Sequence, residues 1–446
     1  MWEENESHWS LEIRDLESDS VYTEKADFVV PAIGRFNAWR MPDIPGISEY
    51  KGHLRHASNW DPSFDPFGKS VAVIGNGASG IQVVANLQKP VKRLDHYARS
   101  KTWVAGAFAG SERTFESQPY SEEQKQSFQD PKTYLAFRKP LEDRYWRRFG
   151  SLFKGSEANL KARDSFMQNM KERLNKKPEL LDRLIPDFSA NCRRPTPGPG
   201  YLEALSQDHV HYIQTPIKRF TETGIETVDG EIRDVDAILC ATGANVDMAP
   251  PFPIRAYGVD LAAAWKSDGL FGFPYTYLGL STPGFPNLLF VHGPHGAGAS
   301  GTVPQSVEVQ LTYHAKLLRK VAREGIKSVT PTKEATDDFI EYSDAFFAKT
   351  VLSENCSSWY NSGRPGSRIH GIWPGSGMHV TAVRREPRWE DWEYTYLSES
   401  GNRFAWYFGN GGTRKETDLT SDATSYLKIP SEIDLRDLHE SWWNLP

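Results

Sequence analysis

The clearest pattern of apolar and polar residues in the chain runs through residues 69–87, KSVAVIGNGASGIQVVANL. A run of four apolar residues leads into three glycines in GxGxxG spacing. The apolar residues Ile81, Val84 and Leu87 then recur at helical spacing. This segment therefore predicts a buried strand, a tight glycine turn and a helix with one buried face.

A glycine turn between a strand and a helix is typical of dinucleotide binding. The three glycines, Gly75, Gly77 and Gly80, permit a tight turn, close approach of the backbone to a pyrophosphate, and close packing of helix on strand. The helix N-terminus adds free N–H groups and the positive end of its dipole. We predict that these glycines and Ser79 bind a dinucleotide; a purely structural glycine turn is the alternative.

The end of the next strand, within residues 91–101, indicates which dinucleotide would bind. An acidic residue there would accept a hydrogen bond from the ribose 2′-hydroxyl of NAD, whereas a basic residue would neutralise the 2′-phosphate of NADP. Asp95 is at a suitable distance along the chain but falls in the middle of the predicted strand, and Arg99 and Lys101 fall at its end. We therefore favour NADP, with a surface basic pair as the alternative reading.

Two other regions predict strands and helices around this unit. Residues 8–34 alternate apolar and polar residues in short bursts and end in DFVVPAIG, which predicts a small β-meander and a buried strand. Three prolines near residues 31–45 mark a connector. Residues 106–190 are long, charged and helical in pattern, which predicts an inserted helical subdomain.

Residues 210–243 predict a strand, a hairpin and a final buried strand. The last strand ends in Ala241, Thr242 and Gly243, where a glycine lets backbone approach a cofactor. We predict that these three residues contribute to cofactor binding. The alternative is an ordinary buried parallel strand.

Composition and charge narrow the class of protein. The 446 residues, 39% apolar and 25% charged, predict an ordinary globular protein of two or three domains. A net charge of −6 argues against a nucleic-acid partner, and the most basic stretch, residues 160–177, has interspersed acids and predicts a solvated helix. The acidic N-terminus and the absence of an 18-residue apolar run predict a cytoplasmic protein with no membrane span.

The three cysteines, Cys192, Cys240 and Cys356, are far apart in sequence. Their odd number and the lack of a CxxC pair suit a reducing compartment, so we expect neither a zinc cluster nor a disulfide framework. The histidines His53 and His56 of residues 50–61, YKGHLRHASNWD, have no further His or Cys at ligand spacing. We therefore predict no metal site.

Residues 50–61 instead match a known fingerprint. Tyr50, Gly52, His56 and Trp60, followed by Asp61, fit FxGxxxHxxxW followed by Pro or Asp, with Tyr in place of Phe. With the glycine turn, the ATG strand end, FPNLLFVHGP and SSWY, this pattern resembles the class B flavoprotein monooxygenases, most closely the Baeyer–Villiger monooxygenases. The aromatic-rich tail resembles the fungal secondary-metabolism branch. Trp60 favours Baeyer–Villiger enzymes over relatives that oxidise nitrogen or sulfur.

The resemblance implies an activity and a set of site residues. NADPH would reduce bound FAD, and one oxygen atom of O2 would be inserted beside the carbonyl of a small ketone to give an ester or lactone. Arg194 is implied as the catalytic cation, with Arg193 as the fallback and an exposed arginine pair before a proline turn as the alternative. His56, the second catalytic candidate, is implied as a hinge residue that couples domain movement. Trp359 is implied near the nicotinamide, or else packs in the core.

One departure from the family concerns its first glycine turn, which binds FAD and which this sequence does not contain. The expected fold class is α/β, with two Rossmann-like dinucleotide-binding domains, of which the FAD domain is incomplete at its N-terminus, and an inserted helical subdomain. A noncatalytic NADP-binding remnant or partner protein is therefore the alternative function, and a nitrogen- or sulfur-oxidising enzyme is a further one.

The resemblance also divides the chain into segments. The partial FAD domain and hinge span residues 1–63, the two parts of the NADP domain span 64–105 and 191–243, the helical insertion spans 106–190, and the remaining FAD domain with the substrate pocket spans 244–446. The sequence indicates neither the ketone nor the oligomeric state.

Overall fold

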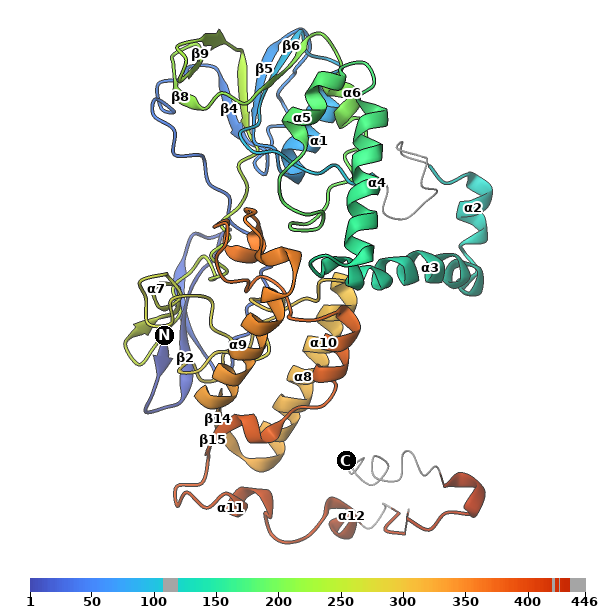
Figure 1. The fold of residues 1–446 in the computed structure, drawn as a ribbon. Helices are drawn as coiled ribbons and strands as arrows, with labels where there is room; N and C mark the ends of the chain where they lie inside the picture. The colour runs from blue at the N-terminus through green and yellow to red at the C-terminus, as the bar shows by residue number, and fades with distance from the viewer. Residues whose placement is uncertain (107–118, 419–421, 425, 434–446) are drawn as a thin grey trace.

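The computed structural model describes residues 1–106, 119–418, 422–424 and 426–433. Figure 1 shows two lobes, one above the other, with helix α3 extending to one side. We call the upper one, formed by residues 41–105 and 162–240, the sheet lobe, and the lower one, formed by residues 2–29 and 248–396, the mixed lobe. Each lobe has its own hydrophobic core.

The sheet lobe is built on a parallel sheet with the strand order β4-β11-β5-β6-β7. Its strands are β4 (His53–His56), β5 (Ser70–Ile74), β6 (Arg93–Tyr97), β7 (Val210–Ile213) and β11 (Ala237–Cys240). Helix α1 (Ala78–Leu87) packs on one face through Ile81, Val84 and Leu87, which are buried. The strand, turn and helix predicted from residues 69–87 are therefore confirmed.

The other face of the sheet is covered by a small antiparallel sheet of β8 (Ile217–Phe220), β9 (Gly224–Thr227) and β10 (Ile232–Asp234). Phe220 and Ile225 pack there against Ala72 and Ile74. This is the hairpin that the sequence predicted, with a third short strand added.

The helical insertion contains α2 (Glu122–Ser127), α3 (Pro131–Trp146), the 3₁₀ helix η1 (Arg147–Leu152), α4 (Glu157–Arg173), the short η2 (Pro178–Leu180) and α5 (Leu181–Leu184), and α6 (Tyr201–Leu205) follows it. Phe166 and Met170 of α4 are buried in the same core as Leu94 and Trp103. The expectation of a solvated helix over residues 160–177 is thus wrong for one face, because two large apolar side chains among the charges reach the sheet lobe.

The mixed lobe combines segments from distant parts of the chain. The strands β1 (Trp2–Glu3), β2 (His8–Arg14) and β3 (Val21–Ala26) form the predicted meander. The other elements of this lobe are β12 (Arg255–Ala256), β13 (Val259–Asp260), α7 (Leu261–Ala264), α8 (Val303–Glu324), β14 (Ile326–Pro331), α9 (Lys333–Ala348), η3 (Val351–Ser353), η4 (Trp359–Asn361), α10 (Gly377–Arg384), η5 (Trp389–Asp391) and β15 (Trp392–Tyr396). The segment that follows the lobe contains α11 (Phe404–Tyr407), α12 (Arg414–Thr417) and η6 (Pro430–Glu432). Trp2 and Trp9 share one core with Tyr313 and Trp392.

The buried strand expected at DFVVPAIG, residues 27–34, does not form. Val29 makes a single parallel bridge to Leu288, while Val30 and Ile33 are about two-fifths exposed, at 40% and 42%. Pro31 has no N–H group to continue a ladder of hydrogen bonds. This segment is therefore an extended connector, which contacts the mixed lobe through main-chain hydrogen bonds of Val29 and Pro31.

The expectation that the cysteines form no disulfide is also wrong. Cys192 and Cys356, separated by 164 residues, are joined by a disulfide with a Cα–Cα distance of 6.4 Å. Cys240 is free and buried. The spacing of cysteines in the sequence could not reveal this pair, because the two loops that carry them meet only in the folded chain.

The described residues can be compared with the predictions about membrane spans and metal sites. None of the helices in the described ranges is long and apolar enough to cross a membrane. Over the same ranges, no group of three or more His, Cys, Asp or Glu side chains is placed to hold a metal ion.

Candidate functional site

The glycine turn after β5 is shaped by close backbone contacts. A Cβ atom at Gly75, where φ is +115°, would lie 2.4 Å from the carbonyl oxygen of Ala241, and one at Gly80 would lie 2.0 Å from the carbonyl oxygen of Gly75. A Cβ atom at Gly77 would meet nothing within 4 Å. Packing therefore requires glycine at two of these positions, and the third is open to a ligand.

Helix α1 begins directly after this turn. Its N-cap is Gly77, which supplies no side-chain hydrogen bond to the first N–H groups, and Ser79 is exposed in the first helical turn. The free N–H groups and the positive end of the helix dipole suit a phosphate group.

The tripeptide Ala241, Thr242 and Gly243 lies beside the glycine turn. The N–H of Ala241 donates to the carbonyl oxygen of Ile74 at 2.7 Å, and Thr242 and Gly243 are exposed beyond the end of β11. Both segments lie at the carboxyl ends of neighbouring parallel strands, which is where ligands bind in open sheets of this kind.

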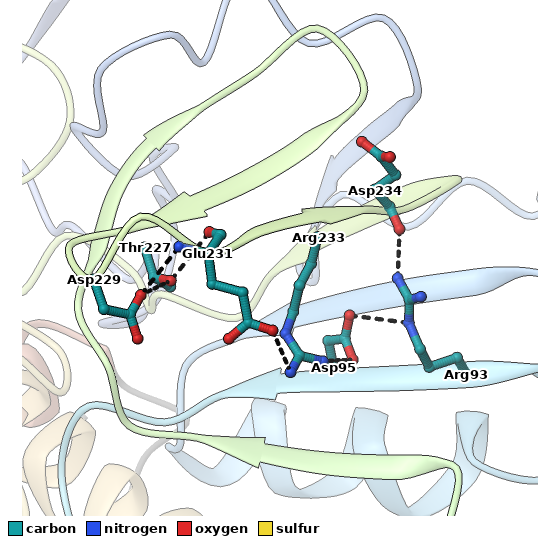
Figure 2. A network of polar contacts seen from close by, with 7 residues as sticks. All are labelled: Arg93, Asp95, Thr227, Asp229, Glu231, Arg233 and Asp234. Carbon is teal, nitrogen blue, oxygen red and sulfur yellow. Dashed lines mark hydrogen bonds and ion pairs between the residues drawn. The ribbon is translucent and has the colours of Figure 1, made fainter.

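Asp95 cannot contact a nucleotide at this edge. Figure 2 shows it between two arginines, with its carboxylate 3.2 Å from Arg93 Nε and 3.3 Å from Arg233 Nη1. The carboxylate is fully buried under β10, on the face of the sheet opposite α1. By contrast, Arg99 is exposed two residues beyond β6, and Lys101 follows it half-buried.

The fingerprint residues pack between the sheet and the connector. Tyr50 is buried and donates through Oη to the carbonyl oxygen of Val235 at 2.8 Å. A Cβ atom at Gly52 would lie 2.2 Å from that Oη, so the tyrosine ring requires glycine there. His53 stacks on Phe64 with the ring centroids 4.3 Å apart, and it is thus a packing residue.

His56 lies at the point where the connector crosses the sheet. Its imidazole is 2% exposed and stacks on Trp39 with the ring centroids 5.1 Å apart. Nδ1 accepts a hydrogen bond from the Ser58 N–H at 3.1 Å, and burial lowers the pKa of the ring. Trp60, the last fingerprint residue, is 43% exposed and contacts Phe64 edge-on. The packing suits a residue that links two segments and not a base exposed to substrate.

A cavity of about 870 Å³ lies beside α3 and the N-terminal end of α8. It is lined by apolar and aromatic side chains together with arginines and one histidine, among them Arg194, Trp359, Arg35, Tyr145, His292 and Tyr360. The structure thus brings together two of the predicted site residues, Arg194 and Trp359. The glycine turn and His56 do not line this cavity.

The two candidate arginines have different surroundings. Arg193 donates through Nη2 to the carbonyl oxygen of Lys101, and its guanidinium lies 5.1 Å from the Phe188 ring centroid. Arg194 is exposed to the cavity and donates through Nη2 to Tyr145 Oη at 3.3 Å. Only Arg194 has N–H groups directed to the cavity.

Arg35 is a cavity residue that sequence reasoning missed. It donates to the main-chain oxygens of His292 and Gly293, each at 3.1 Å, and to that of Gly371. Its guanidinium lies 4.8 Å from the Trp359 ring centroid. Burial lowers its pKa to about 10, so it stays charged at neutral pH. The sequence signal for Arg35 was its charge directly after the apolar segment VVPAIG.

His292 is held in an unusual conformation on the cavity wall. Its φ is +58°, a region that non-glycine residues rarely adopt. Burial and the nearby Arg35 charge lower its pKa to about 4, so the ring is neutral. Nδ1 is buried and has no hydrogen-bond partner within the described residues. A strained residue on a cavity wall indicates a binding function.

These features define a dinucleotide-binding α/β protein with an arginine-lined cavity beside its second lobe. No family model matches the chain. The FAD-binding monooxygenase tazF of Aspergillus terreus is 32% identical over 437 residues, which cover 96% of this chain and 75% of the relative. The FAD-binding monooxygenase moxY of Dothistroma septosporum is 33% identical over 88% of this chain and 63% of the relative. A Baeyer–Villiger monooxygenase of Pseudomonas aeruginosa is 30% identical over 86% and 70%.

Solved structures agree with these relatives. A cyclohexanone monooxygenase from Rhodococcus bound to NADP+ superposes with a TM-score of 0.72 at 23% identity, over 89% of this chain and 79% of the other. OTEMO in complex with FAD and NADP gives 0.72 at 25% identity, over 88% and 79%. The chain belongs to the family of FAD-binding monooxygenases that includes the Baeyer–Villiger enzymes, and the resemblance and the α/β fold class are confirmed. The chain spans about two-thirds to three-quarters of the length of these relatives.

Proposed function

We propose that the protein is a FAD- and NADPH-dependent monooxygenase that inserts one oxygen atom of O2 beside a ketone carbonyl, giving an ester or lactone. The observation that carries the proposal is the meeting of Arg194 and Trp359 on one cavity, with a glycine turn of dinucleotide-binding form in the neighbouring lobe. We further propose a role in secondary metabolism, which the source and names of the fungal relatives support.

The residues present fit the phosphates of NADPH and one flat ring system; the described residues hold a single glycine turn, which we assign to NADPH. The open position at Gly77 and the uncapped start of α1 fit a pyrophosphate, and Arg99 would hold a 2′-phosphate. The aromatic side chain of Trp359 on the cavity wall fits a flat group, such as a flavin or a nicotinamide. When bound, FAD reduced by NADPH supplies the chemistry that activates O2.

The residues of the chain supply charge and exclude water. The weak hydrogen bond of Arg194 to Tyr145 can be exchanged for one to an oxygen atom that gains negative charge, because a charged acceptor binds more strongly than a phenol. Arg35 adds positive charge without giving up its main-chain partners. Apolar residues of the wall, among them Leu141, Leu152 and Ile372, keep water out, which strengthens these electrostatic interactions.

The test begins with the absorbance spectrum of the purified chain after incubation with FAD. We expect a retained yellow flavin that is bleached by NADPH, and formation from a ketone of a product one oxygen atom heavier. A protein that stays colourless with added FAD would overturn the proposal and favour a noncatalytic NADP-binding protein.

A matched pair of arginine variants tests the site. Arg194→Lys keeps a cation but loses the planar set of N–H donors, and it should lower product formation about 10²-fold while NADPH oxidation continues. Arg193→Lys should leave product formation nearly unchanged, since Arg193 points to Lys101. Equal losses in both variants would contradict the assignment of Arg194.

A further inference from the structure

The disulfide joins the two segments that carry the predicted cavity residues. Cys192 lies two residues before Arg194, and Cys356 lies three residues before Trp359. Both cysteines are at most 1% exposed. The covalent link therefore connects, at buried positions, the two segments that carry Arg194 and Trp359.

The arginine wall is held through the neighbours of Arg194, among them Arg193, which donates to the carbonyl oxygen of Lys101, and Asn191, which donates to Ser151 Oγ at 3.0 Å. Asn191 has a φ of +67°, and the segment is irregular until Thr196, which accepts the Ala105 N–H through its carbonyl oxygen at 2.9 Å. The side chain of Arg194 makes a single hydrogen bond, at 3.3 Å, within the described residues. The position of Arg194 thus depends mainly on how its backbone is held.

The tryptophan wall is held firmly. Ser358 accepts the Tyr360 N–H through its side chain at 3.2 Å, and the Asn361 side chain bonds the N–H of Ser358 and the carbonyl oxygen of Cys356 at 3.0 and 2.9 Å. Asn361 is 1% exposed. The turn around Trp359 is therefore a fixed support for the disulfide.

A second link between the walls lies further from Arg194. The carboxylate of Glu354 accepts hydrogen bonds from the N–H and Oγ of Ser189, at 2.7 and 2.8 Å. Ser189 precedes Arg194 by five residues. If the disulfide opened, this contact would keep the segments together. Asn159 would still bond the carbonyl oxygen of Ala190 at 2.8 Å, and Asn191 would still bond Ser151 Oγ at 3.0 Å, so the freedom gained would be greatest at residues 192–195.

We infer that the Cys192–Cys356 disulfide is a positioning element of the cavity, because it holds Arg194 at a fixed place relative to Trp359. Reduction of the disulfide by a dithiol removes this constraint on Arg194. In the release, the dithiol gives two electrons and two protons, the S–S bond breaks to yield two thiols, and the dithiol becomes its own disulfide. The catalytic role of Arg194 rests on the proposed function, whereas the disulfide and its constraint on the segment around Arg194 do not.

Thiol counting and peptide mapping test the link itself. Protein purified without reductant and then denatured should show one reactive thiol, from Cys240, and three after treatment with dithiothreitol. Proteolysis without reductant should yield a cross-linked peptide pair containing residues 192 and 356. Three thiols before reduction would overturn the inference.

Hydrogen exchange tests the positioning role without any activity. Reduction should speed amide exchange in residues 190–196 at least about tenfold, while the glycine turn at residues 75–80 stays unchanged. Dithiothreitol should have no effect on Cys192→Ala/Cys356→Ala, which is the matched control for the reductant. Unchanged exchange in residues 190–196 of the wild-type protein after reduction would overturn the role, and this measurement needs no variant to fold.

Combining loss of the disulfide with Arg194→Lys tests whether the disulfide acts through Arg194. In flavin-loaded protein, reduction or the double alanine variant should lower product formed per NADPH oxidised about tenfold, and in Arg194→Lys the same change should cause no further loss. Independent losses that multiply would overturn a positioning role through Arg194. Absence of flavin and product in the untreated wild-type protein would instead reject the proposed function, while thiol counts and exchange would still decide the link.

Discussion

The sheet lobe and the mixed lobe hold buried charge in different ways. In the sheet lobe, buried Asp95 lies between Arg93 and Arg233, and Arg173 contacts Glu203 at 2.7 Å. In the mixed lobe, Arg384 is 1% exposed and donates to the main-chain oxygens of Leu278, Gly296 and His295, at 2.8 Å for Gly296 and 3.0 Å for His295. No ion pair of Arg384 or Arg35 occurs within the described ranges.

The difference follows from backbone geometry. Parallel strands satisfy one another's N–H and C=O groups, so the sheet itself needs few side-chain donors. Where Arg93 and Arg173 bond main-chain oxygens, those of Asp234 and Gly198, each also contacts a carboxylate. The loop at residues 292–296 has no such ladder, and its buried carbonyl oxygens need donors. Arg35 binds one end of this loop and Arg384 binds the other. The arginines thus replace secondary structure, and their charge remains uncompensated beside the cavity.

Low pH should destabilise the mixed lobe more than the sheet lobe, and this is the largest difference that we expect between them. Burial lowers the pKa of His292, His314 and His370 to about 4 and strongly lowers that of His295, all in the mixed lobe, whereas in the sheet lobe it lowers the pKa of His96 to about 4. Because unfolded histidine has a pKa near 6.5, the unfolded state binds more protons below that value. Their contribution is present above pH 6.5 and is lost as pH falls toward about 4, at up to about 3 kcal/mol per histidine.

Hydrogen exchange as a function of pH checks this expectation. Protection of β14 should fall before that of β5. His314→Gln keeps a donor for the carbonyl oxygen of Phe290 but removes the titration, so it should move the acid transition to lower pH. An unchanged transition would contradict the role of the buried histidines.

Removing one buried arginine should have the next largest effect. Arg384→Met fills similar space but leaves the carbonyl oxygens of Leu278, His295 and Gly296 without donors, so it should lower the free energy of unfolding by more than about 3 kcal/mol. Arg14→Met, at an ion pair with Asp19 in which both side chains are exposed, should lower it by less than about 1 kcal/mol. Denaturant unfolding measures both, and similar values would remove the contrast between the lobes.

Glycine substitutions should separate packing from binding in the sheet lobe. Gly80→Ala forces a Cβ atom against the Gly75 carbonyl oxygen and should destabilise the lobe by about 1–3 kcal/mol. Gly77→Ala meets no protein atom, so the melting temperature should stay the same while NADPH affinity falls at least about tenfold. Unchanged affinity in folded Gly77→Ala would show that the turn does not bind the nucleotide.

Cofactor preference should respond to one exposed residue. Arg99→Ala should weaken NADPH binding about tenfold, because the 2′-phosphate loses a charged donor, and should leave NADH binding unchanged. Lys92→Ala, exposed before the amino end of β6, is the control and should change neither. Titration calorimetry with both cofactors measures the ratio, and an unchanged ratio in Arg99→Ala would contradict the NADP assignment.

The smallest expected effect is in the fingerprint. Tyr50→Phe restores the residue that the family pattern carries but removes the hydrogen bond to Val235, so stability should fall by about 1 kcal/mol. NADPH affinity should not change. A clear loss of affinity in thermal-shift titrations would indicate that Tyr50 acts beyond packing.

The sequence predicted the sheet lobe better than the mixed lobe for a physical reason. In residues 69–87, β5 is a continuous apolar run buried on both faces and α1 buries one face at helical spacing, so local sequence patterns identify both elements. The resemblance to a known family, and not periodicity, indicated Arg194 and Trp359. Arg35 and Arg384 satisfy loop carbonyl oxygens through long-range contacts, and no local pattern reports such contacts. The Cys192–Cys356 pair was missed for the same reason.

The order in which the chain is made has a consequence for its discontinuous lobe. All strands of the parallel sheet are complete once residue 240 has been synthesised. The first strands must wait, because Trp9 donates its indole N–H to the carbonyl oxygen of Pro286 and packs with residues up to Trp392. At about 5–20 residues per second, the roughly 150 residues between these points take about 8–30 s to translate. By then the N-terminal meander, with its two tryptophans, has left the ribosome, and it lacks its partner surface until these residues are made. A chaperone that recognises exposed aromatic residues would therefore contact the meander before that surface forms.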